Sequence, residues 1–314
     1  MEGLCVFDAH CDTISRCWRE YEGLDHNSGA LSLERTAGFQ KYCQFFALWT
    51  ADGYTGFPSG VESVERAYGA LLRCFKEQMA RNPDKILQCR TGKDAENAHR
   101  QGKAAAFLTV EGGELLGCDP NRLEQAAADG VVAINLTWNH ANALSGAHAD
   151  HPEQGLTPIG REFVTKMEEL HIFVDVSHLS EAGFWDVAEM ARRPFLASHS
   201  NTKSVWNHTR NLTNEQITAI IENQGIIGLN LYQDFVGGSR DLDALRAHLD
   251  CILDLGGSAN VALGGDWDGC DTIGDLPSID CLERLYEYLL HHHYQETVVR
   301  GLFYNNLMRV VSQR

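Results

Sequence analysis

The chain has 314 residues, 44% hydrophobic and 22% charged, enough to bury one large core or two smaller ones. Its formal charge of −17 at pH 7 repels phosphate backbones and anionic lipid, so nucleic acid is not an expected partner. The ten cysteines form no Cys-x-x-Cys pair, which favours reduced thiols over a disulfide framework. No stretch reaches the ~20 apolar residues that span a bilayer. We therefore expect a cytoplasmic protein without a membrane partner.

Short apolar runs rich in β-branched and aromatic residues recur along the chain. They are nearly continuously apolar rather than alternating, as parallel strands covered on both faces are. Eight candidate strands follow in chain order: Leu4 to Phe7, Tyr42 to Leu48, Ala104 to Val110, Val131 to Leu136, Ile172 to Val176, Phe195 to Ala197, Ile226 to Leu231 and Val261 to Leu263.

Helical patterns stand between most of these runs. Apolar residues recur at helical spacing from Val61 to Met79 and again from Leu242 to Leu253. Thr213 and Gln216 fit a capping box, in which each side chain pairs with the backbone N–H of the other residue. No glycine-rich dinucleotide fingerprint, internal repeat or linker is visible. The pattern predicts a single (β/α)8 TIM barrel over residues 1–314 rather than a doubly wound sheet.

Polar residues with metal-binding chemistry stand where predicted strands end, which is where barrel enzymes place their sites. His10 and Asp12 follow the first strand two residues apart, so both can point to the same side. Glu111 follows the third strand, and His178 and His199 each end an apolar run in a Ser-His pair. Alone, any of them fits a loop, a cap or a structural histidine. Together they favour a metal site.

Three imidazoles and two carboxylates are enough donors for two divalent ions if one carboxylate bridges them. This nitrogen and oxygen set suits zinc, with manganese, cobalt or iron as alternatives. Asp266 follows the last predicted strand directly and is a candidate proton carrier or further ligand. The alternative for this segment is a simple Asp-Gly turn at Asp268.

The sequence resembles the membrane (renal) dipeptidase family, the metallodipeptidases within the amidohydrolase-like barrels. The resemblance runs from about Leu4 to Val311, and we expect a soluble, bacterial-type member. Five motifs carry it: HCD at 10–12, VEGG at 110–113, DVSHLS at 175–180, SHSNTKSVWNHTRN at 198–211 and GGDWDG at 264–269.

The resemblance implies a dinuclear metal centre and a hydrolytic reaction on dipeptides. His10 and Asp12 would hold one metal ion, His178 and His199 the other, and Glu111 would bridge the two. A hydroxide shared by the ions would attack the amide carbonyl. A homodimer is a further expectation at the level of the family.

The resemblance also assigns residues to the substrate and the proton. Asp266 would pass a proton to the leaving amine. Arg210 would bind the terminal carboxylate of the substrate, with a surface ion pair as the alternative. One position departs from the renal type, which has a substrate-binding His directly after Leu-Thr where this chain has Trp138. His140 would supply the imidazole from two residues further on, or Trp138 would wall the pocket. The sequence leaves both open.

Other interpretations remain at this stage. Tyr232 and the aromatic residues of the 49–57 loop are candidates for the cleft wall, although such residues also form dimer contacts. The same metal pair also serves deamination or the opening of a lactam or cyclic amide. A non-catalytic metal-binding barrel is a further alternative, although it would not need Asp266 or Arg210. A serine hydrolase is disfavoured because no Gly-x-Ser-x-Gly elbow is present.

Overall fold

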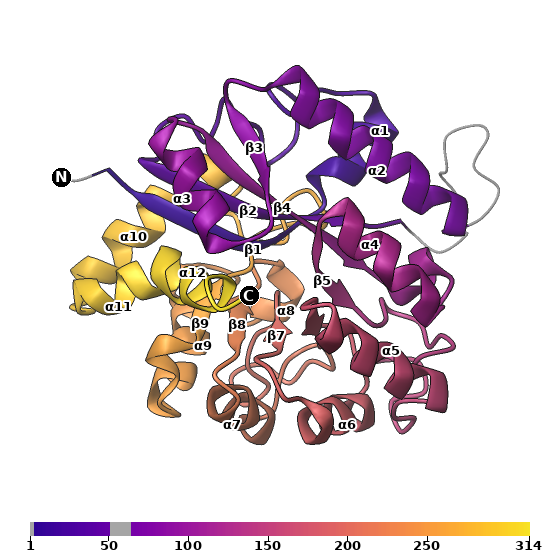
Figure 1. Ribbon diagram of the computed structural model, residues 1–314. Helices are drawn as coiled ribbons and strands as arrows, with labels where there is room; N and C mark the ends of the chain where they lie inside the picture. The colour runs from indigo at the N-terminus through magenta and orange to yellow at the C-terminus, as the bar shows by residue number, and fades with distance from the viewer. Residues whose placement is uncertain (1–2, 51–63) are drawn as a thin grey trace.

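The protein folds into a closed barrel of parallel strands surrounded by helices (Figure 1). The computed structural model describes residues 3–50 and 64–314. Within these residues the sheet has the order β2-β1-β9-β8-β7-β6-β5-β4-β3, and an additional pairing of β2 with β4 closes it. Every strand pairing is parallel. The predicted TIM barrel is therefore confirmed.

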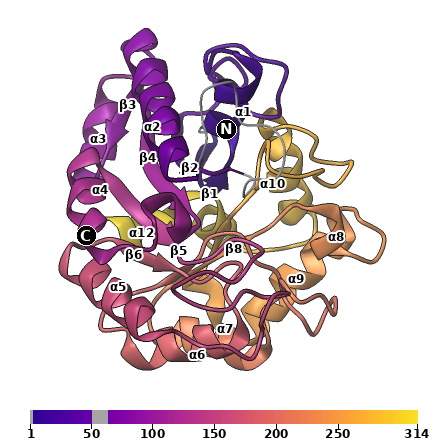
Figure 2. The same ribbon diagram turned by 90° about the vertical axis from the view of Figure 1, so that its right-hand side faces the viewer.

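The described strands are β1 (Cys5–Cys11), β2 (Lys41–Leu48), β3 (Ile86–Cys89), β4 (Ala104–Glu111), β5 (Val131–Asn135), β6 (Phe173–Asp175), β7 (Leu196–Ala197), β8 (Ile226–Leu229) and β9 (Val261–Leu263). The α-helices are α1 (Thr13–Glu20), α2 (Val64–Arg81), α3 (Gly92–Arg100), α4 (Leu123–Asp129), α5 (Pro158–Glu169), α6 (Glu181–Met190), α7 (Asn214–Glu222), α8 (Gln233–Val236), α9 (Leu242–Asp254), α10 (Leu282–His291), α11 (Glu296–Arg300) and α12 (Asn306–Val311). Figure 2 shows helices α3 to α7, α9 and α10 as a ring around the strands.

β1 and β3 differ most from the sequence prediction, and the other strands differ from it by at most two residues at either end. β1 continues to Cys11, so His10 lies inside the strand and Asp12 is the N-cap residue of α1. β3 was not predicted, because Ile86–Cys89 is short and its two central residues are only partly buried. β3 pairs with the first half of β4, and β5 pairs with the second half of β4 along the same edge of that strand. β3 is thus an addition to the expected eight-stranded wall.

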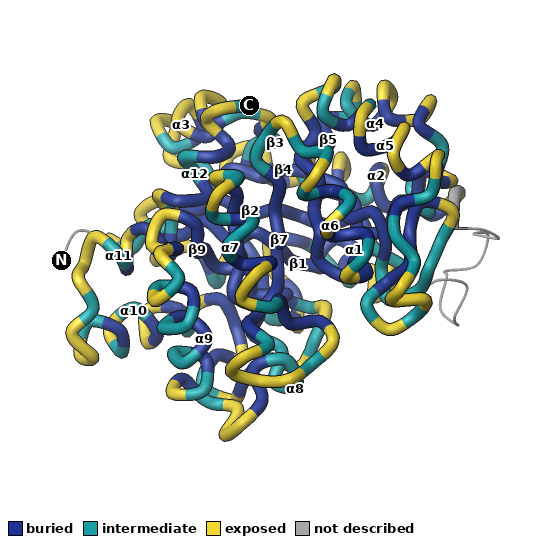
Figure 3. Tube along the Cα trace, turned by 90° about the horizontal axis from the view of Figure 1, so that it is seen from below, coloured by how far each residue is buried: buried dark blue, intermediate teal, exposed yellow. Residues whose placement is uncertain are grey.

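An aromatic cluster fills one part of the barrel. The ring centroids of Phe7 and Phe107 are 5.3 Å apart, and those of Phe7 and Phe45 are 5.5 Å apart. The same cluster includes Leu307 and Val310 of the C-terminal helix α12. Figure 3 shows the buried strands inside and exposed residues along the surrounding helices. α12 therefore packs against this apolar part of the barrel, while the polar candidate residues gather at the carboxyl ends of the strands.

The predicted amphipathic helices are present as α2 and α9. The first residue of the α2 pattern, Val61, lies outside the described residues. The capping box of α7 is also confirmed: Thr213 N donates to Gln216 Oε1 over 2.9 Å, and Gln216 N donates to Thr213 Oγ1 over 3.2 Å. In the described part of the chain, no helix is both long enough and apolar enough to cross a bilayer.

Replacing Thr213 by Ala should lower the free energy of unfolding by about 1 kcal/mol, because the Gln216 N–H at the start of α7 loses its acceptor. Thr213→Ser keeps the oxygen and should retain most of this stability. Urea unfolding followed by circular dichroism measures both variants. An equal loss in the two variants would contradict the capping role.

Candidate metal centre

The five candidate metal ligands come together at the carboxyl ends of the barrel strands. His10 is near the end of β1 and Glu111 is the last residue of β4. Asp12, His178 and His199 follow β1, β6 and β7 by one to three residues. All five side chains are buried. Strand ends far apart in the sequence thus place five candidate donors in one region.

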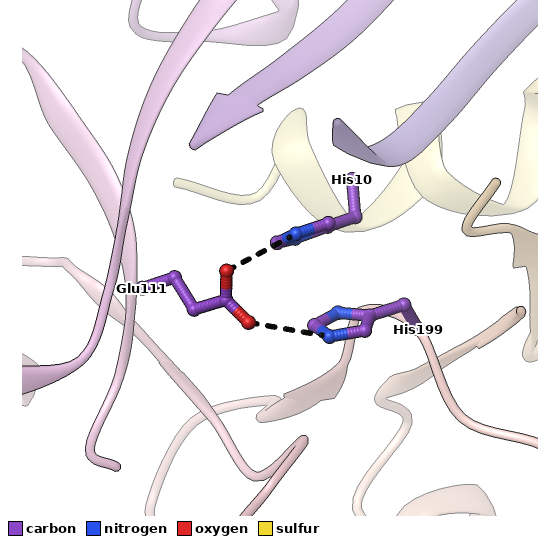
Figure 4. A group of neighbouring side chains, drawn as sticks. All are labelled: His10, Glu111 and His199. Carbon is purple, nitrogen blue, oxygen red and sulfur yellow. Dashed lines mark ion pairs between the residues drawn. The ribbon is translucent and has the colours of Figure 1, made fainter. Parts of the chain in front are cut away.

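Glu111 lies between two groups of imidazoles, and Figure 4 shows its carboxylate facing His10 and His199. Its Oε2 is 3.5 Å from His10 Nε2. Its Oε1 is 2.8 Å from His178 Nε2 and 3.5 Å from His199 Nε2. Each carboxylate oxygen therefore faces different ring nitrogens. A carboxylate that bridges two cations needs this arrangement.

The donor atoms fit divalent cations. His10 Nε2 is 3.7 Å from Asp12 Oδ2 and 3.9 Å from Asp266 Oδ1. His10 Nε2 and Asp12 Oδ1 are both buried without a hydrogen-bond partner among the described residues. Because buried polar atoms are normally paired, these two atoms indicate a missing electropositive partner. Imidazole nitrogens and carboxylate oxygens at such spacing are ligands for zinc and similar ions.

Burial and mutual charge control the ionisation of this cluster. Burial raises the pKa of Glu111 to about 8, and it also raises the pKa of Asp266. Burial lowers the pKa of His178 and His199 well below the usual value, so both imidazoles are neutral. Burial also lowers the pKa of His10, but the charges of Glu111 and Asp12 outweigh burial and raise that pKa above its usual value. Neutral imidazoles have the lone pair that a metal ion requires.

Asp8, which the sequence analysis did not select, holds the end of β1 in place. Its Oδ1 accepts from the backbone N–H of His10 at 2.9 Å and from Gln44 Nε2 at 3.1 Å. Its Oδ2 accepts from Gly265 N at 3.0 Å and from Trp267 Nε1 at 3.1 Å. One buried carboxylate thus ties β1 to β2 and to the segment after β9. Its only signal in the sequence is an acid directly after the first apolar run.

Asp175 has the same role between β6 and β7 and was also missed. Its Oδ1 accepts from the backbone N–H groups of Ser177 and Ser198, both at 3.0 Å. Each serine directly precedes a candidate ligand, His178 or His199. The Asp of the DVSHLS motif therefore fixes the relative position of two histidine-bearing segments.

Asp266 faces the same cluster from the segment after β9. Its backbone has a φ of 58°, a left-handed conformation that is uncommon for residues other than glycine. Its backbone N–H donates to His10 O over 3.1 Å, and its Oδ2 accepts from Asn230 Nδ2 over 3.1 Å. This turn leaves Oδ1 directed at His10. Asn230, another residue that the sequence analysis missed, orients the carboxylate.

Arg210 is buried beside the cluster without a carboxylate partner in the described part of the chain. Its Nη2 donates to His199 O over 3.0 Å and its Nη1 to Ser200 Oγ over 3.3 Å. The guanidinium also lies 5.2 Å from the ring centroid of Phe235. Burial lowers its pKa to about 10, which still leaves it charged at neutral pH. A buried cation held in this way is suited to an anionic group.

A cleft of about 930 Å³ opens over the cluster, and Trp138 and Tyr232 are among the residues that line it. His140 is not among the residues that line it. Its Nδ1 lies 3.8 Å from Asp150 Oδ2. Trp49 also lines the cleft, whereas residues 51–57 of the predicted aromatic loop lie outside the described residues.

Comparisons with known proteins agree with the geometry. An uncharacterized protein in the pqqA 5′ region of Klebsiella pneumoniae is 31% identical over 253 residues, covering 77% of this chain and 93% of that protein. A metallopeptidase from Rhodobacter sphaeroides, solved with a phosphinate mimic of the dipeptide L-Ala-D-Ala, is 26% identical with a TM-score of 0.87, over 98% of this chain and 99% of the other.

A second solved structure, a dipeptidase described as a metallopeptidase of family M19, is 27% identical with a TM-score of 0.88. It covers 99% of this chain, and the match includes 98% of that protein. The family model of the membrane dipeptidases matches residues 1–314. The comparisons thus support a metal-dependent hydrolase, and the chain belongs to the membrane dipeptidase family, Peptidase family M19.

Proposed function

We propose that this protein is a dipeptidase that hydrolyses the amide bond of dipeptides with two divalent metal ions, zinc being the expected ion. The observation that carries the proposal is Glu111, whose two carboxylate oxygens face His10 on one side and His178 and His199 on the other. The family, and the dipeptide mimic bound to the Rhodobacter sphaeroides relative, support a dipeptide as the substrate.

The donor set divides into two groups that share Glu111. His10 and Asp12 would hold one ion, and His178 and His199 would hold the other. Bound ions would supply Lewis-acid chemistry by lowering the pKa of a water molecule and polarising the scissile carbonyl. Asp8 and Asp175 keep the donor-bearing segments in register through their hydrogen bonds to the backbone.

Asp266 is the group we assign to proton transfer. Its Oδ1 is directed at the cluster, and Asn230 holds its Oδ2. Because burial raises its pKa, this carboxylate can take a proton from the attacking water and release it to the departing nitrogen. A carboxylate with an unperturbed pKa would be a weaker base and would take the proton from water less readily.

Arg210 is the group we assign to the substrate carboxylate. The guanidinium is buried, charged and free of ion pairs among the described residues, so a carboxylate at this position gains charge-assisted hydrogen bonds. Trp138 and Tyr232 line the cleft and would contact the side chains of the dipeptide.

The metal-loaded protein should release free amino acids from members of a panel of L,L and L,D dipeptides. Glu111→Ala and Asp266→Asn should each lower kcat/KM by at least ~100-fold, because one removes the shared ligand and the other the proton carrier. The exposed Asp84→Asn serves as a matched control and should retain wild-type activity. If the protein left every dipeptide intact but opened a lactam or a cyclic amide, the site would be assigned to that other class of amide. Hydrolysis that persists in Glu111→Ala would contradict the proposal.

Arg210→Met should remove the preference for a free C-terminal carboxylate. We expect kcat/KM for a dipeptide to fall roughly 10- to 100-fold, because charge-assisted hydrogen bonds are lost. For the same peptide with a C-terminal amide, kcat/KM should fall little, because this peptide has no carboxylate to form those bonds. Arg192→Met, at an exposed position, is the control for the substitution itself. An equal loss on both peptides, with the melting temperature unchanged, would exclude Arg210 as the carboxylate-binding residue.

Divalent metal should stabilise the fold more at pH 8 than at pH 6. Without metal, burial raises the pKa of Glu111 to about 8, and nearby carboxylates raise that of His10 despite burial. Both groups keep protons at pH 6 that a cation must displace. Since these folded-state pKa values exceed the unfolded ones, the metal-free fold binds extra protons and loses stability as pH rises towards 8. Melting temperatures with and without Mn²⁺ test this, and a larger metal-induced shift at pH 6 would be the contrary result.

A further inference from the structure

A chain of hydrogen bonds stands behind the ring of His178. Asn139 Oδ1 is 2.8 Å from His178 Nδ1 and 2.9 Å from His148 Nε2. His148 Nδ1 is in turn 2.8 Å from Thr209 Oγ1. These contacts join the segments after β5, β6 and β7.

This chain is consistent with one assignment of protons. An amide oxygen only accepts hydrogen bonds, so the two ring nitrogens that face it carry protons. The Thr209 hydroxyl then donates to the remaining nitrogen of His148. His178 is left with a bare Nε2, the atom that lies 2.8 Å from Glu111 Oε1 and 2.9 Å from His199 Nε2. The reverse orientation of the amide would protonate Nε2 and remove it from metal binding.

His148 also holds the backbone of His178. The backbone N–H of His148 donates to His178 O over 2.9 Å, and Thr137 Oγ1 donates to the same oxygen over 3.3 Å. His178 has a φ of 70°, a left-handed conformation that a side chain with a Cβ adopts only when its surroundings hold it there. His148 therefore restrains His178 at two points, at the carbonyl directly and at the ring through Asn139.

We propose that Asn139 and His148 are positioning residues that fix the tautomer and ring orientation of His178, and thereby set the affinity of the metal position that His178 serves. The proposal rests on the proposed metal centre. Hydrogen bonds behind a ligating histidine commonly fix its orientation and raise its basicity.

Metal retention tests the proposal directly. The metal-loaded protein is challenged with increasing concentrations of a chelator, and the bound ions are counted per chain. Asn139→Ala and His148→Ala should weaken one of the two bound ions about 10- to 100-fold. Asn139→Asp keeps the acceptor and should restore retention to the wild-type value or above. His151→Ala, at an exposed position of the same loop, is the control and should leave retention unchanged.

The tautomer of His178 gives a second readout that a general loss of packing would not imitate. In zinc-loaded protein with ¹⁵N-labelled histidine, NMR should show a proton on Nδ1 of His178 that exchanges slowly in the wild type and quickly in Asn139→Ala. Wild-type retention of both ions by Asn139→Ala, or no rescue by Asn139→Asp, would overturn the positioning role alone. Failure of the wild type to bind metal would overturn the metal centre and this inference together.

Discussion

The structure depends on one electrostatic constraint, the burial of three carboxylates close together at the base of the cleft. Asp12, Glu111 and Asp266 all lie within 4 Å of His10 Nε2. Like charges so close in a low-dielectric interior cannot all ionise unless a positive charge lies among them. Protons satisfy this need in part, as the raised pKa values of Glu111 and His10 show. Under the proposed function, divalent cations would satisfy this need better and would make the cluster reactive.

The barrel supplies the rigidity that this cluster requires. Parallel strands bring their carboxyl ends to one mouth, and the buried Asp8 and Asp175 then link neighbouring segments through backbone N–H groups. Asp266 and His178 both have left-handed backbones, with φ of 58° and 70°. Such conformations persist where surrounding contacts over-determine them. The energetic cost of holding these two residues is therefore borne by the hydrogen bonds of the segments around them.

Strand-end position was enough to select the five candidate ligands and Asp266, which the structure brings together, because apolar runs ending in His, Asp or Glu are visible in the sequence. Residues that act through long-range contacts were not visible. Asp8 directly follows one predicted strand and Asp175 lies inside another. The role of each carboxylate as an acceptor becomes evident only when distant N–H donors lie beside it. β3 was missed because a half-buried strand of four residues has no apolar run. His148 lies in the irregular segment between β5 and α5. In such a segment the separation of two residues along the chain does not predict their distance in the fold.

The central claim is that the cluster around Glu111 binds two divalent ions. Anomalous diffraction at the zinc absorption edge, on crystals of zinc-loaded protein shown to hydrolyse dipeptides, measures both the number and the position of the ions. The account predicts two peaks per chain on opposite sides of the Glu111 carboxylate, one beside His10 and the other beside His178 and His199. A single peak, or peaks away from Glu111, would contradict it.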